Sequence, residues 1–179
     1  MTTLYVDNIA PNLQSKISAP NLTLPAGAVI QTQSVQCGST GNDLTLTTAG
    51  VWTDIPEAAI TFTPKYSNSK ILIETYHHGY LGNNGASNEW MGLALRIMAD
   101  SSNLSQTNAN TADYYAATYG GDNSREMAYA LESAYYSPDS TSAIAIKIQA
   151  FFRGATGGNK SVIVNRYGRG MLKVMEIAQ

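Results

Sequence analysis

The stretch AITFTPKYSNSKILIETYHHGY (Ala59–Tyr80) contains two segments in which apolar and polar residues alternate, separated by a turn. In the first segment, Ile60 and Phe62 alternate with threonines. After the turn, Ile71 and Ile73 resume the alternation. A repeat of two residues places one face of an extended chain in a core and the other outside. The stretch therefore predicts a strand–turn–strand unit.

The turn PKYSNSK contains residues that end one strand and begin another. Pro64 withholds a backbone donor and ends the first strand, and the side chains of Ser67, Asn68 and Ser69 can cap the turn. Lys70 keeps the start of the second strand in solvent. We interpret the unit as a hairpin of a rigid sandwich whose outer faces are left free to contact other subunits.

Similar segments recur along the chain, with turns rich in Gly, Asn, Ser and Pro between them. They lie at residues 28–36, 43–55, 58–64, 69–82, 89–100, 114–140, 142–154, 160–168 and 168–178. The segment 114–140 is expected to hold two strands around a turn at Gly120–Ser124, and a Gly-rich hairpin is expected at Gly154–Asn159. Eight or nine regularly spaced strands predict an all-β fold, an antiparallel β-sandwich of jelly-roll type.

The segment 89–100 and the closing segment 168–178 are both predicted to be strands. EWMGLALRIMAD (residues 89–100) has some helix propensity, but its residues alternate cleanly and we predict a strand. The polar segment that follows, ADSSNLSQTNANTAD, is expected to be a loop. In the closing segment, Leu172, Val174 and Ile177 are expected to face the core.

Residues 1–27 differ from the rest of the chain and are predicted to be an extended arm, with the sandwich at residues 28–179. Pro11, Pro20 and Pro25 exclude a helix or a central strand. A disordered tail is the alternative. The apolar side chains expected to anchor the arm on a neighbour are Leu4, Val6, Ile9, Leu13, Ile17, Leu22 and Leu24.

The chain is poor in charge. Charged residues make up 13% of its 179 residues and the formal net charge is −2, against about 25% charged residues in an average soluble domain. A low-charge surface is easily desolvated and suits packing against other subunits. No global basic field points to nucleic acid. The basic residues near the C-terminus are expected on solvated faces or in interface ion pairs: Arg153, Lys160, Arg166, Arg169 and Lys173.

The N-terminal sequence shows no secretory signal, and no apolar run reaches the roughly 20 residues that span a bilayer. We expect a protein that is made in the cytosol and is soluble, or that leaves the cell by another route such as lysis, and that does not insert into a membrane. The single cysteine, Cys37, cannot form an internal disulfide and is expected to be a small buried side chain rather than a reactive thiol.

Catalytic and metal-binding patterns are not apparent. His77 and His78 are adjacent, so on a strand they point to opposite faces and cannot readily share one metal. Ordinary surface or interface histidines are expected; symmetry-related copies meeting on an axis are the alternative. Nothing selects a carboxylate pair such as Glu126 and Glu132. We therefore predict no enzyme activity, metal or cofactor.

Two features are candidates for partner or glycan contact. The loop Gly82–Asn88 carries Asn83 and Asn84 at a tip. Tyrosines, which offer rigid amphipathic contact area, cluster downstream of it. These tyrosines are Tyr114, Tyr115, Tyr119, Tyr129, Tyr135 and Tyr136. The alternatives are core or subunit contacts for the tyrosines and a plain connection for the loop.

An ordered set of segments resembles the β-sandwich module of virion structural and tail-fibre proteins of marine tailed phages, notably cyanophages. The set comprises Trp52 with Asp54, the strand end Thr63–Pro64, and Ser69–Ile73, followed by YYSPDSTSAIAIKIQAFF and LKVMEIA. Together with the opening LPAGAVIQTQSV, it covers most of residues 24–179. The resemblance implies a trimeric, non-enzymatic particle protein.

The arm is too short for a long fibre shaft. We therefore expect a homotrimeric virion protein, either a capsid decoration (cement) protein or a short head or tail fibre. Its arm would dock by strand addition on another virion protein, such as the major capsid protein or a head/tail adaptor. A receptor-binding head that recognises a host surface glycan or protein is the alternative.

Overall fold

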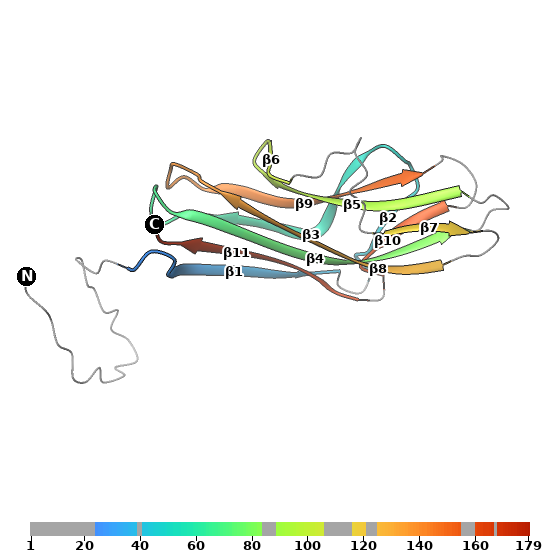
Figure 1. The fold of residues 1–179 in the computed structure, drawn as a ribbon, viewed down its shortest axis with the longest axis horizontal. Coiled ribbons are helices and arrows are strands. Elements are labelled where there is room, and N and C mark those ends of the chain that lie inside the picture. The colour runs from blue at the N-terminus through green and yellow to red at the C-terminus, as the bar shows by residue number, and fades with distance from the viewer. Residues whose placement is uncertain are drawn as a thin grey trace, which may run out of the picture.

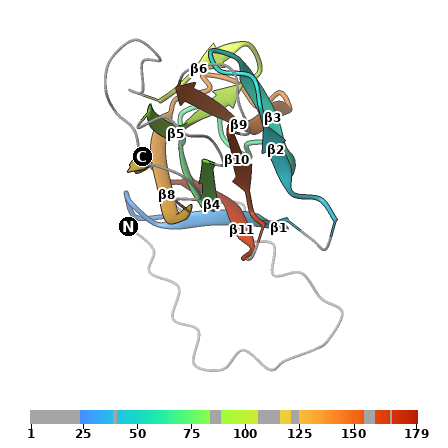
Figure 2. The same ribbon diagram turned by 90° about the vertical axis from the view of Figure 1, so that its right-hand side faces the viewer.

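The protein is a sandwich of two antiparallel β-sheets, as a computed structural model shows (Figure 1). The structure describes residues 24–38, 41–83, 89–105, 116–120, 125–154, 160–166 and 168–179. Seen from one end, the two sheets face each other across the core (Figure 2). The predicted fold class is confirmed for these residues.

The long strand β4 (Lys70–Asn83) is the centre of the six-stranded sheet. Strand β8 pairs along one of its edges, and β11 and β10 share the other edge. β1 then pairs with β11, and β2 pairs with β10. The bounds of these strands are β1 Val29–Cys37, β2 Leu44–Leu46, β8 Arg125–Tyr136, β10 Lys160–Val164 and β11 Gly170–Ile177.

The five-stranded sheet is built around β9 (Ile144–Gly154), which lies between β3 (Trp52–Phe62) and β5 (Glu89–Ala99). The other edge of β5 pairs with β7 (Ala116–Gly120) and the short β6 (Ser102–Asn103). The strand predicted over residues 89–100 is confirmed for residues 89–99. The two strands predicted on either side of the 120–124 turn are β7 and β8.

Consecutive strands mostly lie in different sheets. The chain crosses between sheets from β2 to β3, from β3 to β4, from β4 to β5, from β7 to β8, from β8 to β9 and from β9 to β10. This alternation is the jelly-roll arrangement. The hairpins predicted at residues 64–69 and 154–159 are therefore wrong, because each of these connections joins strands of opposite sheets. An alternating pattern shows where a strand ends but not which sheet receives the next one.

The core lies between the sheets and is filled by alternate residues of most strands. Its largest fully buried side chains include Phe62, Phe152, Ile71, Ile73, Leu95, Ile97, Ile146, Ile148 and Leu172. Each such side chain stabilises the fold by roughly 1.5–3 kcal/mol. Leu172 and Val174 face this core as predicted, but Ile177 does not. The residue of β11 that continues the buried row is Glu176.

Candidate functional site

The outer face of the six-stranded sheet is apolar where β4, β8 and β11 run side by side. Leu131 and Tyr135 of β8 are 65% and 67% exposed, and Tyr76 of β4 is 40% exposed. Half-buried side chains of β4 and β11 surround them. We call this surface the apolar face; it consists of Leu72, Tyr76, Leu131, Tyr135, Met171 and Met175.

Strand register aligns these side chains in rows across three strands. Tyr76 is paired with Leu131 on one side and with Met171 on the other. Leu72 is paired in the same way with Tyr135 and Met175. Because directly opposed residues of antiparallel strands share one face, each row forms a continuous apolar strip.

One charged row lies between the two apolar strips. Glu74 of β4 is paired in register with Lys173 of β11 and with Ser133 of β8. The Lys173 Nζ and Glu74 Oε2 atoms are 3.9 Å apart, and both side chains remain partly exposed, at 34% and 47%. The ion pair is therefore loose, and both groups are accessible from outside the sheet.

A shallow hollow of about 400 Å³ opens on the apolar face beside this row. Its lining comes from three neighbouring strands, so the hollow depends on the sheet pairing rather than on any single segment. The lining residues are Glu74, Thr75, Tyr76, Leu131, Glu132, Ser133 and Met171.

The outer face of the five-stranded sheet has a different chemistry. Gln149 of β9 lies in register between Asp54 of β3 and Arg96 of β5. Arg96 Nε donates to Gln149 Oε1 at 2.7 Å, and Gln149 Nε2 donates to Asp54. Lys147 Nζ donates to the second Asp54 oxygen at 2.9 Å. These hydrogen bonds from Gln149 and Lys147 lower the pKa of Asp54.

An aromatic pair extends this network, which we call the polar face. The Arg96 guanidinium lies 4.4 Å from the centroid of the Trp52 ring. Trp52 also packs against Phe151, with ring centroids 4.9 Å apart. The ring of Trp52 is thus engaged by two neighbours, and the polar groups beside it are hydrogen-bonded to one another. Asp54, Arg96, Lys147 and Gln149 are thus linked in one network.

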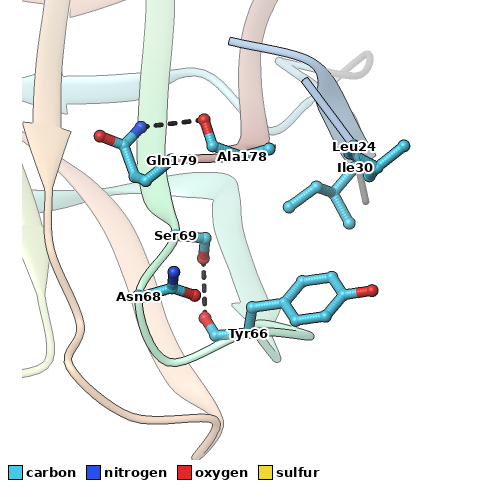
Figure 3. A pocket seen from close by; sticks show the side chains of 7 residues that line it. All are labelled: Leu24, Ile30, Tyr66, Asn68, Ser69, Ala178 and Gln179. Atoms are coloured by element: carbon cyan, nitrogen blue, oxygen red, sulfur yellow. Dashed lines mark hydrogen bonds between the residues drawn. The ribbon is translucent and has the colours of Figure 1, made fainter. Parts of the chain in front are cut away.

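A small pocket of about 160 Å³ lies where the described chain begins (Figure 3). Leu24, Ile30 and Tyr66 contribute apolar side chains to it, and Asn68, Ser69, Ala178 and Gln179 complete the lining. Gly27 N donates to Ala178 O and Ala178 N donates to Ala28 O, both at 2.9 Å. The base of the predicted arm is therefore tied to the C-terminal end of the sandwich.

The turn between β3 and β4 is anchored by Glu176, a residue distant in sequence. The Glu176 carboxylate accepts hydrogen bonds from Lys65 N, Tyr66 N, Ser69 Oγ and Gln31 Nε2, at 2.7–3.0 Å. Its burial alone would raise its pKa, but these four donors lower the pKa overall. Ser69 caps the turn as predicted, through a 2.8 Å bond to Tyr66 O.

His77 and His78 point to opposite faces of β4, as expected, but both are buried rather than surface histidines. The Nε2 atom of His77 lies 2.9 Å from Thr75 Oγ1, which itself donates to Met171 O. Its Nδ1 lies 3.1 Å from Asn165 Nδ2 and 3.3 Å from Asn165 Oδ1. Burial lowers the pKa of His77 to about 4, partly offset by the hydrogen bond with Asn165.

Among the described residues there is no group of three or more His, Cys, Asp or Glu side chains that could hold a metal ion. Cys37 is buried, as predicted, and burial together with the charge of Glu57 raises its pKa to about 11. Asp100, which follows β5, accepts a hydrogen bond from Ala145 N of β9 at 3.0 Å.

Some predicted contact residues fall within the described structure. Tyr135 is exposed on the apolar face, whereas Tyr136 packs against the core. Leu24 lines the pocket at the base of the arm. Asn83 ends β4, Tyr119 lies in β7 and Tyr129 lies in β8. The other predicted residues lie outside the described range, namely Leu4, Val6, Ile9, Leu13, Ile17, Leu22, Asn84, Tyr114 and Tyr115.

The basic residues near the C-terminus mostly follow the prediction. Arg153, Arg166 and Arg169 are exposed, and Lys173 pairs with Glu74. Lys160 is buried, which the prediction of a solvated face did not anticipate.

Neither the apolar face nor the anchoring role of Glu176 was predicted from the sequence. The sequence does contain a signal for the apolar face. In β4 and β11, apolar residues occur among the side chains that point inward and also among those that point outward, as in KILIETY and GMLKVMEI. Strands that are apolar on both faces are typical of sheets buried on both sides. The role of Glu176 has no comparable signal, since its partners lie about 110 or 145 positions away.

Comparison with known proteins identifies no family. No known family model matches the chain, and no curated protein matches it. Among solved structures, the chain is similar to Eiger TNF from S. frugiperda, with 8% identity and a TM-score of 0.39 over 83% of this chain and 94% of that one. A likeness this weak carries no argument about function. Within the described part of the chain, no helix has the length and apolar character to cross a bilayer.

Proposed function

We propose that the protein is a non-enzymatic structural component of a tailed-phage virion. In this proposal it assembles as a homotrimer through its sandwich and docks on the particle through its N-terminal arm, as a capsid decoration protein or a short head or tail fibre. The observation that carries the proposal is the contrast between the apolar face and the polar face.

The contrast between the apolar face and the polar face favours a role in binding other proteins over a catalytic role. Polar groups on the polar face bind one another, so that face is stable in water without a partner. The apolar face has no such network and exposes two large side chains by about two thirds. An apolar patch on a sheet is a common mark of a protein–protein contact.

The second support is the position of the arm. Its base lies at β1, which is an edge strand of the six-stranded sheet among the described residues. The hydrogen bonds of Gly27 and Ala28 with Ala178 hold that base against the sandwich. An arm that leaves from an anchored edge can reach a neighbour without disturbing the core. Leu4, Val6, Ile9, Leu13, Ile17 and Leu22 remain the predicted anchors.

The proposal is tested by co-sedimentation of the purified chain with capsid shells that lack it, and separately with host cells. We expect saturable binding to shells, lost on removal of residues 1–23 and weakened by the double change Leu13→Ser and Ile17→Ser. Gln14→Ser is the matched control and should bind normally.

Binding to cells and not to shells would contradict this proposal and favour a receptor-binding head. One observation favours that second candidate, the 67% exposure of Tyr135, a predicted glycan contact. In that case Tyr135→Ala should reduce adhesion to cells.

A further inference from the structure

We propose that in the free protein residues 13–17 of the arm lie across the apolar face of their own chain, with Leu13 and Ile17 on its two apolar strips. The inference goes beyond the proposed function, which concerns the arm on the particle, and it does not depend on that function. Residues 1–23 lie outside the described structure. Their place is therefore inferred from the surface that would receive them, which exposes Leu131 and Tyr135 by about two thirds.

The base of the arm lies at the end of the sheet where the apolar face begins. Gly27 and Ala28 are hydrogen-bonded to Ala178, which directly follows β11. Three residues back along β11, Met175 belongs to the first apolar strip, which we call the near strip. The far strip, with Met171, lies four residues further along the same strand. An arm that leaves from this base starts beside the near strip.

The spacing of apolar residues in the arm matches the spacing of the two strips. The strips lie four residues apart on β4, β8 and β11, which is about 13 Å along the strands. Leu13 and Ile17 are also four residues apart, and they point to the same side of an extended chain. Pro11 and Pro20 on either side of this pair favour an extended conformation. Ser15, midway between the two apolar residues, would then face the charged row between the strips.

The arm is long enough for this arrangement. Ile17 precedes Leu24 by seven residues, about 23 Å of extended chain, and Leu24 lines the pocket at the base of the arm beside Ala178. The charged row lies five residues back from Ala178, at Lys173, a distance of about 17 Å. Moving one strand across to β4 makes the direct path about 18 Å. The segment can therefore bring Ile17 to the near strip and Leu13 to the far strip.

The charges of the hollow favour this segment over a second copy of the face. Glu74 and Glu132 line the hollow, and no Lys or Arg is among its lining residues; Lys173 pairs loosely with Glu74 at 3.9 Å. Lys16 is the one basic residue among residues 1–23 and adjoins Ile17, whereas the one acidic residue, Asp7, lies far from it. The segment thus brings a positive charge to a face with an excess of carboxylates. Two copies of the face would bring these carboxylates together.

This arrangement makes the arm a cover for the apolar face. While residues 13–17 lie on the strips, Leu131 and Tyr135 are shielded from water and from contact with other chains. The same residues cannot lie on a neighbour at the same time. Departure of the arm therefore uncovers the face, which couples docking of the arm to contacts made through the face.

The test is disulfide cross-linking within the full-length chain. Ser15→Cys is combined with Ser133→Cys, an exposed position of β8 that is paired with Glu74 in the charged row. Under mild oxidation of a dilute solution we expect a disulfide within one chain, detected by peptide mass after digestion. Cys37 is buried, and the unaltered chain gives the background.

The matched control combines Ser15→Cys with Thr61→Cys, an exposed position of β3 on the other sheet. A freely moving arm can reach this position as well, because Gln31 Nε2, near the start of β1, donates to Thr63 O at 2.8 Å. We expect the Ser133 pair to form its disulfide at least about tenfold faster than the control pair, since a docked arm raises the effective concentration at one place only.

Two sets of changes test the contacts themselves. Leu13→Ser with Ile17→Ser, and separately Lys16→Glu, should reduce the cross-linking rate to that of the control pair, whereas Lys16→Arg should leave it unchanged. In the chain without added cysteines, Leu13→Ser with Ile17→Ser should also increase the fluorescence of a dye that binds exposed apolar surface, and Gln14→Ser should not. Circular dichroism verifies that each variant is folded.

Equal rates for the Ser133 and Thr61 pairs, or disulfides that form only between chains, would overturn the inference; the second result would assign the face to another copy. The shell-binding assay is read separately. An arm that cross-links to its own face in a protein that binds no shells would contradict the virion role and leave this inference standing.

Discussion

The carboxylate of Glu176, in the last strand, accepts hydrogen bonds from the backbone N–H groups of Lys65 and Tyr66 at 2.9–3.0 Å. Lys65 and Tyr66 belong to the connection that carries the chain from one sheet to the other between β3 and β4. The contact therefore joins the C-terminal strand, the sheet crossing and, through Gln31, the first strand. Glu176 is fully buried, so these bonds are shielded from water.

Glu176→Gln should lower the free energy of unfolding by about 2–3 kcal/mol, since the amide replaces one acceptor oxygen by a donor and leaves buried N–H groups without acceptors. Urea unfolding followed by circular dichroism measures the change. Glu74→Gln is the matched control on the outer face, and we expect an effect within about 0.5 kcal/mol because exposed ion pairs contribute little. Equal effects of the two changes would contradict the anchoring role of Glu176.

Stability should fall as the pH drops from about 6.5 toward 4, because the pKa of His77 is lowered to about 4 in the folded protein. Between these values the unfolded chain binds a proton that the folded chain does not, so lower pH favours unfolding. The contribution is about 3 kcal/mol across this window. Glu176, whose folded pKa is also lowered, should add to the loss at still lower pH.

Unfolding by urea at a series of pH values measures this dependence. In His77→Gln the slope between pH 6.5 and 4 should become flatter, even if the variant is less stable at pH 7. An unchanged slope would show that another group is responsible.

Gly170→Ala should be strongly destabilising, by about 2 kcal/mol or more, because overpacking a rigid site forces its neighbours to shift. A Cβ atom at this position would lie 2.4 Å from His77 Nδ1 and 2.8 Å from the Tyr76 carbonyl oxygen. Gly82→Ala is the control within β4, since its Cβ would meet its nearest neighbour at an ordinary 3.5 Å. Thermal unfolding of both variants compares them, and similar midpoints would contradict the close packing at Gly170.

Cys37 should not react with a disulfide reagent such as Ellman's reagent while the protein is folded at pH 8. Its thiol is buried and its pKa is raised to about 11, so the nucleophilic thiolate is scarce. The rate should increase at least about a hundredfold in urea, where the pKa returns to about 8.5. The absorbance of the thiolate released from the reagent measures the reaction rate. Rapid labelling of the folded chain would contradict the burial of Cys37.

Several features of the fold were predictable from local pattern. Ile60, Phe62, Ile71 and Ile73 lie on the buried side of their strands as the two-residue repeat indicates. Residues 89–99 form a strand in spite of their helix propensity. The two-residue repeat of a strand and the residue types of a turn reflect local backbone preferences. They can therefore be recognised without knowing which strands pair with one another.

The sheet to which each strand belongs was not predictable in this way. The connections at 64–69 and 154–159 look like hairpin turns, yet both cross between sheets. Pairing depends on the contacts of β4 with β8, β10 and β11, which follow it in sequence by some 40–110 residues. A local pattern contains no information about such contacts.

By itself, the sequence determined that this protein is built of antiparallel strands, that its surface carries little charge and that Cys37 is buried. Only the tertiary structure decided that Glu176 rather than Ile177 continues the buried row of β11, that His77 is an interior residue and that one outer face is apolar while the other carries a hydrogen-bonded polar network. The physical reason is that strand periodicity is a property of neighbouring residues. The partners that satisfy a buried carboxylate, or that line up across three strands, are assembled from distant parts of the chain by packing.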